Sequence, residues 1–87
     1  MFYTYILESP RGAWYYGHCQ DMVHRLHQHN SGLNKSTRNK GPWEVIFLRV
    51  FDSKQEANQF ELYLKKLKNK GYIKVTFAAY FLASAVR

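Results

Sequence analysis

The first twenty residues alternate between apolar and polar positions in the way that strands do. Residues 2–8 (FYTYILE) and 13–19 (AWYYGHC) are rich in aromatic and β-branched side chains, which favour strands. Between them, residues 9–12 (SPRG) place Pro and Gly where a type I turn prefers them. The pattern predicts an antiparallel hairpin.

Two helices are expected after the hairpin. Asp21 is placed to cap a helix over residues 21–31, because its carboxylate can accept hydrogen bonds from the first turn. Ser53 and Glu56 have the spacing of a capping box for a second helix over residues 53–69. The apolar side chains spaced to face a core in this second helix are Ala57, Phe60, Leu64 and Leu67.

The remaining segments have less regular patterns. Residues 43–51 (WEVIFLRVF) are apolar at odd and even positions, which predicts a central strand covered by helices on both faces. Residues 31–42 form a polar, basic loop that we expect either to face a substrate or to be mobile. Residues 75–87 are apolar and ambiguous between helix and strand. Four alanines favour a helix over residues 77–85, and residues 77–86 could serve as a homodimer contact or a docking segment.

Length and composition bound the class of protein. The 87 residues allow one domain, residues 1–87, and the 17% aromatic content excludes intrinsic disorder. The single cysteine, Cys19, excludes an internal disulfide and favours a reducing compartment. No secretory signal is recognisable, and the longest uncharged stretch has 12 residues, too few to span a membrane. We therefore expect a cytoplasmic protein with no membrane partner.

The charge is strongly positive, with 13 Lys and Arg against 6 Asp and Glu, a net charge of +7. A basic single domain favours a polyanion such as nucleic acid, although lysines at a helix end can also simply complement the helix dipole. The basic residues form two patches instead of one helix face, which favours nucleic acid over a membrane surface. The residues that we expect to contact DNA are Lys35, Arg38 and Lys40 in the polar loop and Lys65 and Lys68 at the end of the second helix.

Some polar residues fall where a simple apolar core would not need them. Glu61 lies four residues after Ala57, at the edge of the apolar stripe. A buried carboxylate needs a cationic side chain or a metal, unless Glu61 reaches solvent. Arg25 and His29 share one side of the first helix, where they either lie at a solvated edge or present a guanidinium and an imidazole to a phosphate. Gly17 interrupts the second strand, and such glycines often mark a close approach by another group.

The other acidic residues fall at caps, turns and strand ends, so no cluster of carboxylates remains for a two-metal site. Metal chemistry would therefore use one ion on one carboxylate, completed by water and phosphate oxygens, as Mg²⁺ tolerates.

Taken together, these residues give the chain a pattern that resembles the GIY-YIG nuclease family, and in particular its short single-domain bacterial members, over about residues 2–74. The residues that match the family's motifs, in chain order, are Tyr3-Thr4-Tyr5, Tyr15-Tyr16-Gly17, Arg25, His29 and Glu61. The resemblance implies an α+β fold in which a small three-stranded antiparallel sheet is flanked by helices. It also implies a metal-dependent endonuclease that hydrolyses DNA with a single Mg²⁺ or Mn²⁺, with structure selectivity and DNA repair among the options.

The resemblance assigns roles to the site residues. Tyr5 would act as the general base beside the attacking water, and Tyr15 would position water or phosphate. Arg25 would stabilise the phosphorane, His29 would assist at phosphate or water, and Glu61 would hold the metal. Because an unperturbed tyrosine has a pKa near 10, Tyr5 would need a basic neighbour. His18, next to Gly17, is the candidate for that neighbour, with a surface histidine on an edge strand as the alternative.

The sequence also departs from the family pattern. Tyr3 replaces the glycine of the first motif, and Thr76 stands where some members have an asparagine. No additional DNA-binding domain is recognisable, so we expect weak, salt-sensitive and largely nonspecific binding. The alternative function is a catalytically silent module of the same fold that binds nucleic acid or a partner protein.

Overall fold

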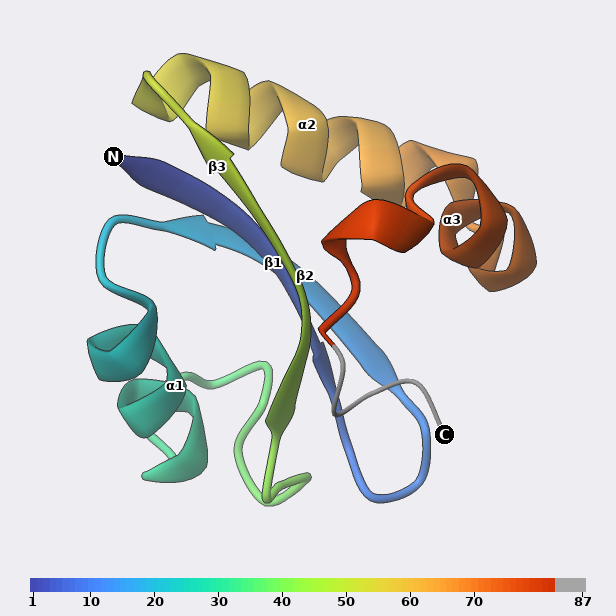
Figure 1. Cartoon of the computed structure of the whole chain (residues 1–87). Coiled ribbons are helices and arrows are strands. Elements are labelled where there is room, and N and C mark those ends of the chain that lie inside the picture. Colours follow the sequence, from blue (N-terminus) through green and yellow to red (C-terminus); the bar gives the residue numbers. More distant parts are fainter. Residues whose placement is uncertain (83–87) are drawn as a thin grey trace.

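A three-stranded antiparallel sheet with the strand order β2–β1–β3 organises the fold. The computed structural model describes residues 1–82. Its elements are β1 (Phe2–Glu8), β2 (Trp14–Cys19), α1 (Met22–Asn30), β3 (Glu44–Phe51), α2 (Lys54–Leu67), α3 (Lys70–Thr76) and the 3₁₀ turn η1 (Ala78–Tyr80). Figure 1 shows α1 on one side of the sheet and α2 on the other. The predicted α+β fold is confirmed.

Both predicted helix caps are present. The Asp21 carboxylate accepts a hydrogen bond from the backbone N–H of His24 at 3.0 Å. Ser53 Oγ accepts from the N–H of Glu56 at 3.2 Å and donates to the Glu56 carboxylate at 2.9 Å. These caps satisfy N–H groups that have no partner within their own helix, so α1 and α2 begin where the sequence predicts. Among the described residues, no helix has the length and apolarity needed to cross a membrane.

The β1–β2 hairpin fixes which side chains share a face of the sheet. Gly12 closes its turn at φ +85°, in the left-handed region that glycine adopts without strain. Tyr5 lies opposite Gly17, and Thr4 lies opposite His18. Because side chains alternate along a strand, Tyr5 and Gly17 belong to one face, and Thr4 and His18 belong to the other.

Each face of the sheet carries its own apolar core. The buried residues of the core on the α1 face are Tyr5, Leu7, Cys19 and Trp43. The buried residues of the core on the α2 face are Ile6, Ile46, Phe47, Leu64 and Ile73. The sheet is therefore covered on both sides, and Tyr5, one of the site residues described below, belongs to the core on the α1 face.

The predicted central position of residues 43–51 was wrong. This segment forms β3, which lies at an edge of the sheet, while β1 is the central strand. Its apolar residues nevertheless face both cores, since Phe47 packs on the α2 face and Leu48 on the α1 face. Apolar residues at both odd and even positions therefore indicated that both faces of the strand are covered. They did not indicate how many strands pair with it.

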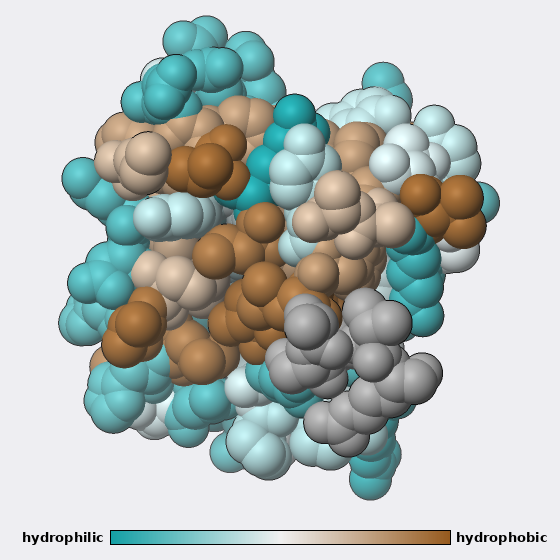
Figure 2. All heavy atoms as spheres, in the orientation of Figure 1, coloured by the Kyte–Doolittle hydropathy of each residue, from teal (hydrophilic) through white to brown (hydrophobic). Residues whose placement is uncertain are grey.

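The predicted helix over residues 77–85 was also wrong for its described part. After η1, Phe81 forms a β-bridge with Phe47, and Leu82 N–H donates to the Ile46 carbonyl at 2.9 Å. The exposed backbone of an edge strand offers such pairing, and it overrides the helix propensity of alanine. Residues 83–85 lie outside the described residues. Figure 2, drawn in the orientation of Figure 1, shows apolar residues gathered in the middle of the view, where β3 lies. The homodimer or docking role of residues 77–86 stays a prediction.

Candidate active site

A buried hydrogen-bonded chain links β1, α1 and the loop that follows α1. The Tyr5 hydroxyl lies 2.9 Å from His29 Nε2, and His29 Nδ1 lies 2.8 Å from Thr37 Oγ1. His29 and Thr37 are each only 1% exposed. The Tyr15 ring packs against the His29 imidazole with 4.9 Å between ring centroids, and the partly buried Arg25 lies one helical turn before His29. We call these five residues the tyrosine–histidine cluster.

Gly17 makes the position of the Tyr5 ring possible. A Cβ atom at residue 17 would overlap Cζ and Oη of Tyr5 and would lie 3.0 Å from its Cε2. The ring therefore passes directly over the backbone of β2 to reach His29. This confirms the expectation that the glycine marks a close approach, and the approaching group is the first tyrosine of the site.

Burial sets the protonation states in this cluster. It raises the pKa of Tyr5, an effect that Tyr15 reinforces and Arg25 partly opposes. Burial, together with the positive charge of Arg25, lowers the pKa of His29. At neutral pH the pair is therefore a protonated phenol bonded to a neutral imidazole, and a free Tyr5 phenolate is not favoured.

A second group, which we call the glutamate cluster, consists of His18, Glu61 and Lys65. Glu61 is 7% exposed. Its Oε1 accepts from His18 Nδ1 at 2.6 Å, and its Oε2 accepts from Lys65 Nζ at 2.6 Å. The expected cationic partner is thus confirmed and consists of basic side chains. The proposed assistance of His18 to Tyr5 was wrong, because His18 bonds Glu61 on the α2 face and His29 is the basic neighbour of Tyr5.

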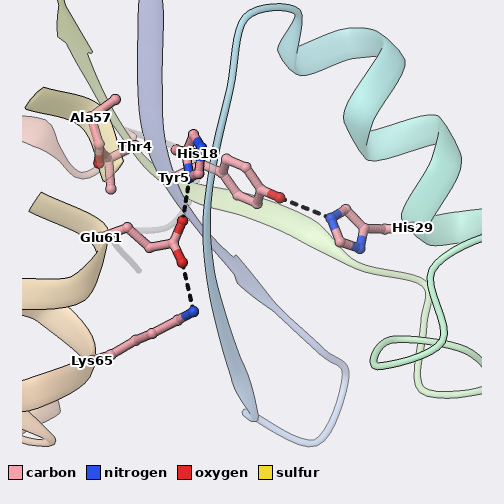
Figure 3. Close-up of polar contacts among 7 residues, drawn as sticks. All are labelled: Thr4, Tyr5, His18, His29, Ala57, Glu61 and Lys65. Carbon is pink, nitrogen blue, oxygen red and sulfur yellow. Dashed lines mark hydrogen bonds and ion pairs between the residues drawn. The ribbon is translucent and has the colours of Figure 1, made fainter. Parts of the chain in front are cut away.

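The two clusters lie on opposite faces of the sheet and approach each other at β2. Gly17 underlies the Tyr5 ring, and the next residue, His18, binds Glu61. Figure 3 shows Glu61 and Lys65 on one side of this strand and the Tyr5–His29 bond on the other. The structure therefore groups Tyr5 directly with His29 and places Glu61 across an edge strand from them.

The donor set at Glu61 fits one divalent cation and no more. Within residues 1–82, no three His, Cys, Asp or Glu side chains gather where they could hold a metal ion. A single carboxylate, with water and substrate oxygens, is sufficient for Mg²⁺ or Mn²⁺. The ammonium group of Lys65 already contacts Glu61 Oε2, so a metal ion would have to displace or share with it. Lys65 is about half exposed and is free to move toward solvent.

The basic residues expected to contact DNA have different environments. Arg38 Nε donates to the Gly32 carbonyl at 3.1 Å, which ties this exposed side chain back to its own loop. Lys65 is paired with Glu61. Lys35, Lys40 and Lys68 are exposed, so these three present their charge to solvent.

A further basic patch is formed by Lys70 and Lys74 of α3 around Trp14 of β2. Their Nζ atoms lie 5.1 and 5.7 Å from the Trp14 ring centroid. Lys70 Nζ also donates to the Gly12 carbonyl at 2.7 Å. Trp14 and His18 have the same strand parity, so this patch lies on the same face of β2 as Glu61.

Two residues show what the sequence pattern does and does not reveal about the site. Tyr3 is partly buried against the α1-face core, so the residue that replaces the motif glycine packs as an ordinary core aromatic. Thr37 was missed, because it lies in the polar loop, where no periodicity distinguishes a buried hydroxyl from an exposed one. Only the folded structure reveals its surroundings, in which Trp43 Nε1 donates to the Thr37 carbonyl at 3.0 Å.

Comparison with known proteins gives a consistent result. Residues 1–73 match the family model described as the GIY-YIG catalytic domain. The UPF0213 protein BH0048 of Halalkalibacterium halodurans is 39% identical over 69 residues, covering 78% of this chain and 73% of the relative. The UPF0213 protein YazA of Bacillus subtilis is 38% identical over 69 residues, covering 78% of this chain and 70% of the relative. The solution NMR structure of the UPF0213 protein BH0048 from Bacillus halodurans superimposes with a TM-score of 0.54 at 35% identity, covering 90% of this chain and 85% of that one.

Proposed function

The chain belongs to the GIY-YIG family, and we propose that it is a metal-dependent endonuclease that hydrolyses DNA phosphodiester bonds. Family membership supports a nuclease and nucleic-acid binding in general. The observation that carries the specific proposal is the buried bond between Tyr5 and His29, whose lowered pKa favours the neutral imidazole, close to Arg25 and across β2 from Glu61.

The geometry favours a substrate that lies across the edge of β2. This strand has no neighbour on its outer side within the described sheet, and both clusters adjoin it at Gly17 and His18. A phosphodiester bound there would have Arg25 and the tyrosines on one side and Glu61 on the other. Lys70 and Lys74 of α3, which lie beside Trp14 at the start of β2, would contact phosphates of the same nucleic acid.

In this proposal, Tyr5 and His29 act as one proton-accepting pair. Because burial disfavours a phenolate, Tyr5 accepts the proton of the attacking water only as it gives its own proton to His29 Nε2. Arg25 places a permanent positive charge beside the phosphate, where negative charge accumulates in the transition state. Tyr15 packs against His29 and orients the water or the phosphate.

Glu61 is the side chain that would hold a divalent ion. When bound, the ion would stabilise negative charge on the leaving oxygen. His18 donates to the other carboxylate oxygen, which fixes the orientation of the carboxylate without requiring a second protein ligand.

Nicking of supercoiled plasmid with Mg²⁺ or Mn²⁺ tests the proposal. Wild-type protein should nick the plasmid, whereas Glu61→Gln and Arg25→Ala should lower the rate by at least about a hundredfold. Lys66→Ala is the matched control, because Lys66 is an exposed residue of the same helix as Glu61. Wild-type rates in both site variants would refute the assigned roles.

The alternative, a module that binds nucleic acid without turnover, is favoured by one observation: Lys65 already neutralises Glu61. Such a module would bind DNA in a salt-dependent way, and neither metal nor Glu61→Gln would change its affinity. Structure selectivity, a role in DNA repair and a cytoplasmic location stay predictions.

A further inference from the structure

We propose that Thr37 is a positioning residue for the hydrolysis, because its hydroxyl fixes His29 in the tautomer that carries the proton on Nδ1. In this tautomer Nε2 has a free lone pair that faces the Tyr5 hydroxyl. The catalytic consequence rests on the proposed function, whereas the tautomer itself is a property of the folded protein.

The hydrogen-bond partners of His29 select this tautomer. Thr37 Oγ1 lies 2.8 Å from His29 Nδ1 and 3.4 Å from the Asn34 carbonyl oxygen. A carbonyl only accepts, so the Thr37 hydroxyl can donate to Asn34 and use a lone pair to accept from Nδ1–H. Tyr5 then donates to Nε2, and each of the three protons has an acceptor.

The other tautomer leaves a buried proton without a partner. If Nε2 carried the proton, it would donate to the Tyr5 oxygen, and Tyr5 could no longer donate to His29. Among residues 1–82, His29 is the one partner in the structure that can accept a hydrogen bond from the Tyr5 hydroxyl. The neighbouring Arg25 is only a donor. An unpaired buried hydroxyl is costly, so the Nδ1–H tautomer is preferred.

The loop is built to hold Thr37 at this distance. The buried Trp43 donates from Nε1 to the Thr37 carbonyl at 3.0 Å. The Asn30 side-chain oxygen accepts from the backbone N–H of Trp43 at 2.7 Å, which ties the end of the loop to the end of α1. Thr37 N–H also bonds the Asn34 carbonyl at 3.2 Å. The hydroxyl is thus fixed relative to the helix that carries His29.

The tautomer determines whether the proton can leave the attacking water. As the water oxygen forms its bond to phosphorus, one water proton moves to Tyr5 Oη, and the Tyr5 proton moves to His29 Nε2. The bond from phosphorus to the leaving oxygen then breaks, its electron pair stays on that oxygen, and the oxygen takes up a proton from solvent. The resulting imidazolium donates from Nδ1 to Thr37 and from Nε2 to Tyr5. With the proton initially on Nε2, no lone pair would face Tyr5, and this transfer could not occur.

Thr37→Val tests the inference, because valine keeps the shape of threonine and removes the hydroxyl. Thr37→Ser is the matched control that keeps the hydroxyl. The direct measurement is the tautomer of His29, read from the ¹⁵N chemical shifts of its ring nitrogens at a pH at which the imidazole is neutral. Wild type and Thr37→Ser should show Nδ1–H, and Thr37→Val should shift the population toward Nε2–H.

Kinetics give the second reading. Thr37→Val should lower kcat by about tenfold or more, with little change in KM, and Thr37→Ser should restore the rate. An Nε2–H tautomer in the wild type, or an unchanged tautomer in Thr37→Val, would overturn the inference. If Thr37→Val fails to fold, the tautomers of wild type and Thr37→Ser still decide. If the wild type cleaves no DNA, the proposed function fails, while the NMR result still tests the role of Thr37.

Discussion

Gly17→Ala should destabilise the protein through one specific overlap. The added methyl group would occupy the space of the Tyr5 ring, approaching Cζ and Oη more closely than real atoms can and lying 3.0 Å from Cε2. The ring lies in a buried core and cannot move toward solvent without giving up the 2.9 Å bond to His29. The substitution therefore links stability directly to the geometry of the site.

The size of the effect follows from three contributions. Overpacking of a buried core costs about 1–3 kcal/mol, and loss of the Tyr5–His29 hydrogen bond adds about 1 kcal/mol. Alanine regains up to about 1 kcal/mol relative to glycine through its lower chain entropy when unfolded. The free energy of unfolding should fall by about 1–3 kcal/mol, and the rate of DNA cleavage should fall with it even where the protein remains folded.

Urea unfolding followed by tryptophan fluorescence measures this change. Gly71→Ala is the matched control, because an added Cβ there lies 3.5 Å from its nearest neighbour, and it should leave stability unchanged or raise it. In a Tyr5→Leu background the ring is absent, and Gly17→Ala should become nearly neutral. An equal loss of stability in both backgrounds would show that the overlap with Tyr5 is not the cause, and would refute the reasoning.

Three further predictions concern charge. Lys65→Met removes the ammonium group that contacts the Glu61 carboxylate. Mn²⁺ titration should show about two- to fivefold tighter binding than in wild type or in the control Lys66→Met, since such an ion pair is worth about 0.5–1 kcal/mol. Equal affinities would show that Lys65 does not compete with the metal ion for Glu61. Because burial lowers the pKa of His29 below its usual value, the unfolded chain binds more protons, so stability should fall as the pH drops below about 6.5. Urea unfolding at about pH 7.5 and about pH 5.5, on either side of that value, should show a smaller fall in His29→Gln, and an identical fall would contradict this. Lys70→Ala combined with Lys74→Ala should weaken DNA binding, as measured by fluorescence anisotropy. The slope of log K against log salt concentration should become shallower by about 0.9 for each phosphate that the variant no longer neutralises. An unchanged slope would show that this patch is not part of the DNA interface.

Local chemistry explains what the sequence could predict. The caps at Asp21 and Ser53 depend on residues only three positions apart, so their sequence signatures suffice. Gly17 was recognisable because glycine weakens a strand and needs a reason to be there. Glu61 was recognisable because a carboxylate beside an apolar stripe needs a partner.

Long-range pairing explains what the sequence could not predict. The partner of Glu61 could have been a metal or a side chain, and only the packing of α2 against β2 brings His18 to its carboxylate. His18 was the predicted neighbour of Tyr5, but the alternation of side chains along the strands places the two on opposite faces of the sheet. The position of α1 brings His29 to Tyr5 instead. Pairing of Leu82 with β3 depends on which strand lies at the edge, and alanine content carries no information about that.

The central claim is that two clusters on opposite faces of the sheet act on one phosphodiester bond. Single-turnover cleavage of a labelled DNA by Tyr5→Phe, Glu61→Gln and the double variant tests it most directly. Each single change should lower the rate by about a hundredfold or more, and the double variant should be little slower than the slower single, because groups that act as a unit are not additive. A wild-type rate in either single variant, or losses that multiply in the double variant, would contradict the account.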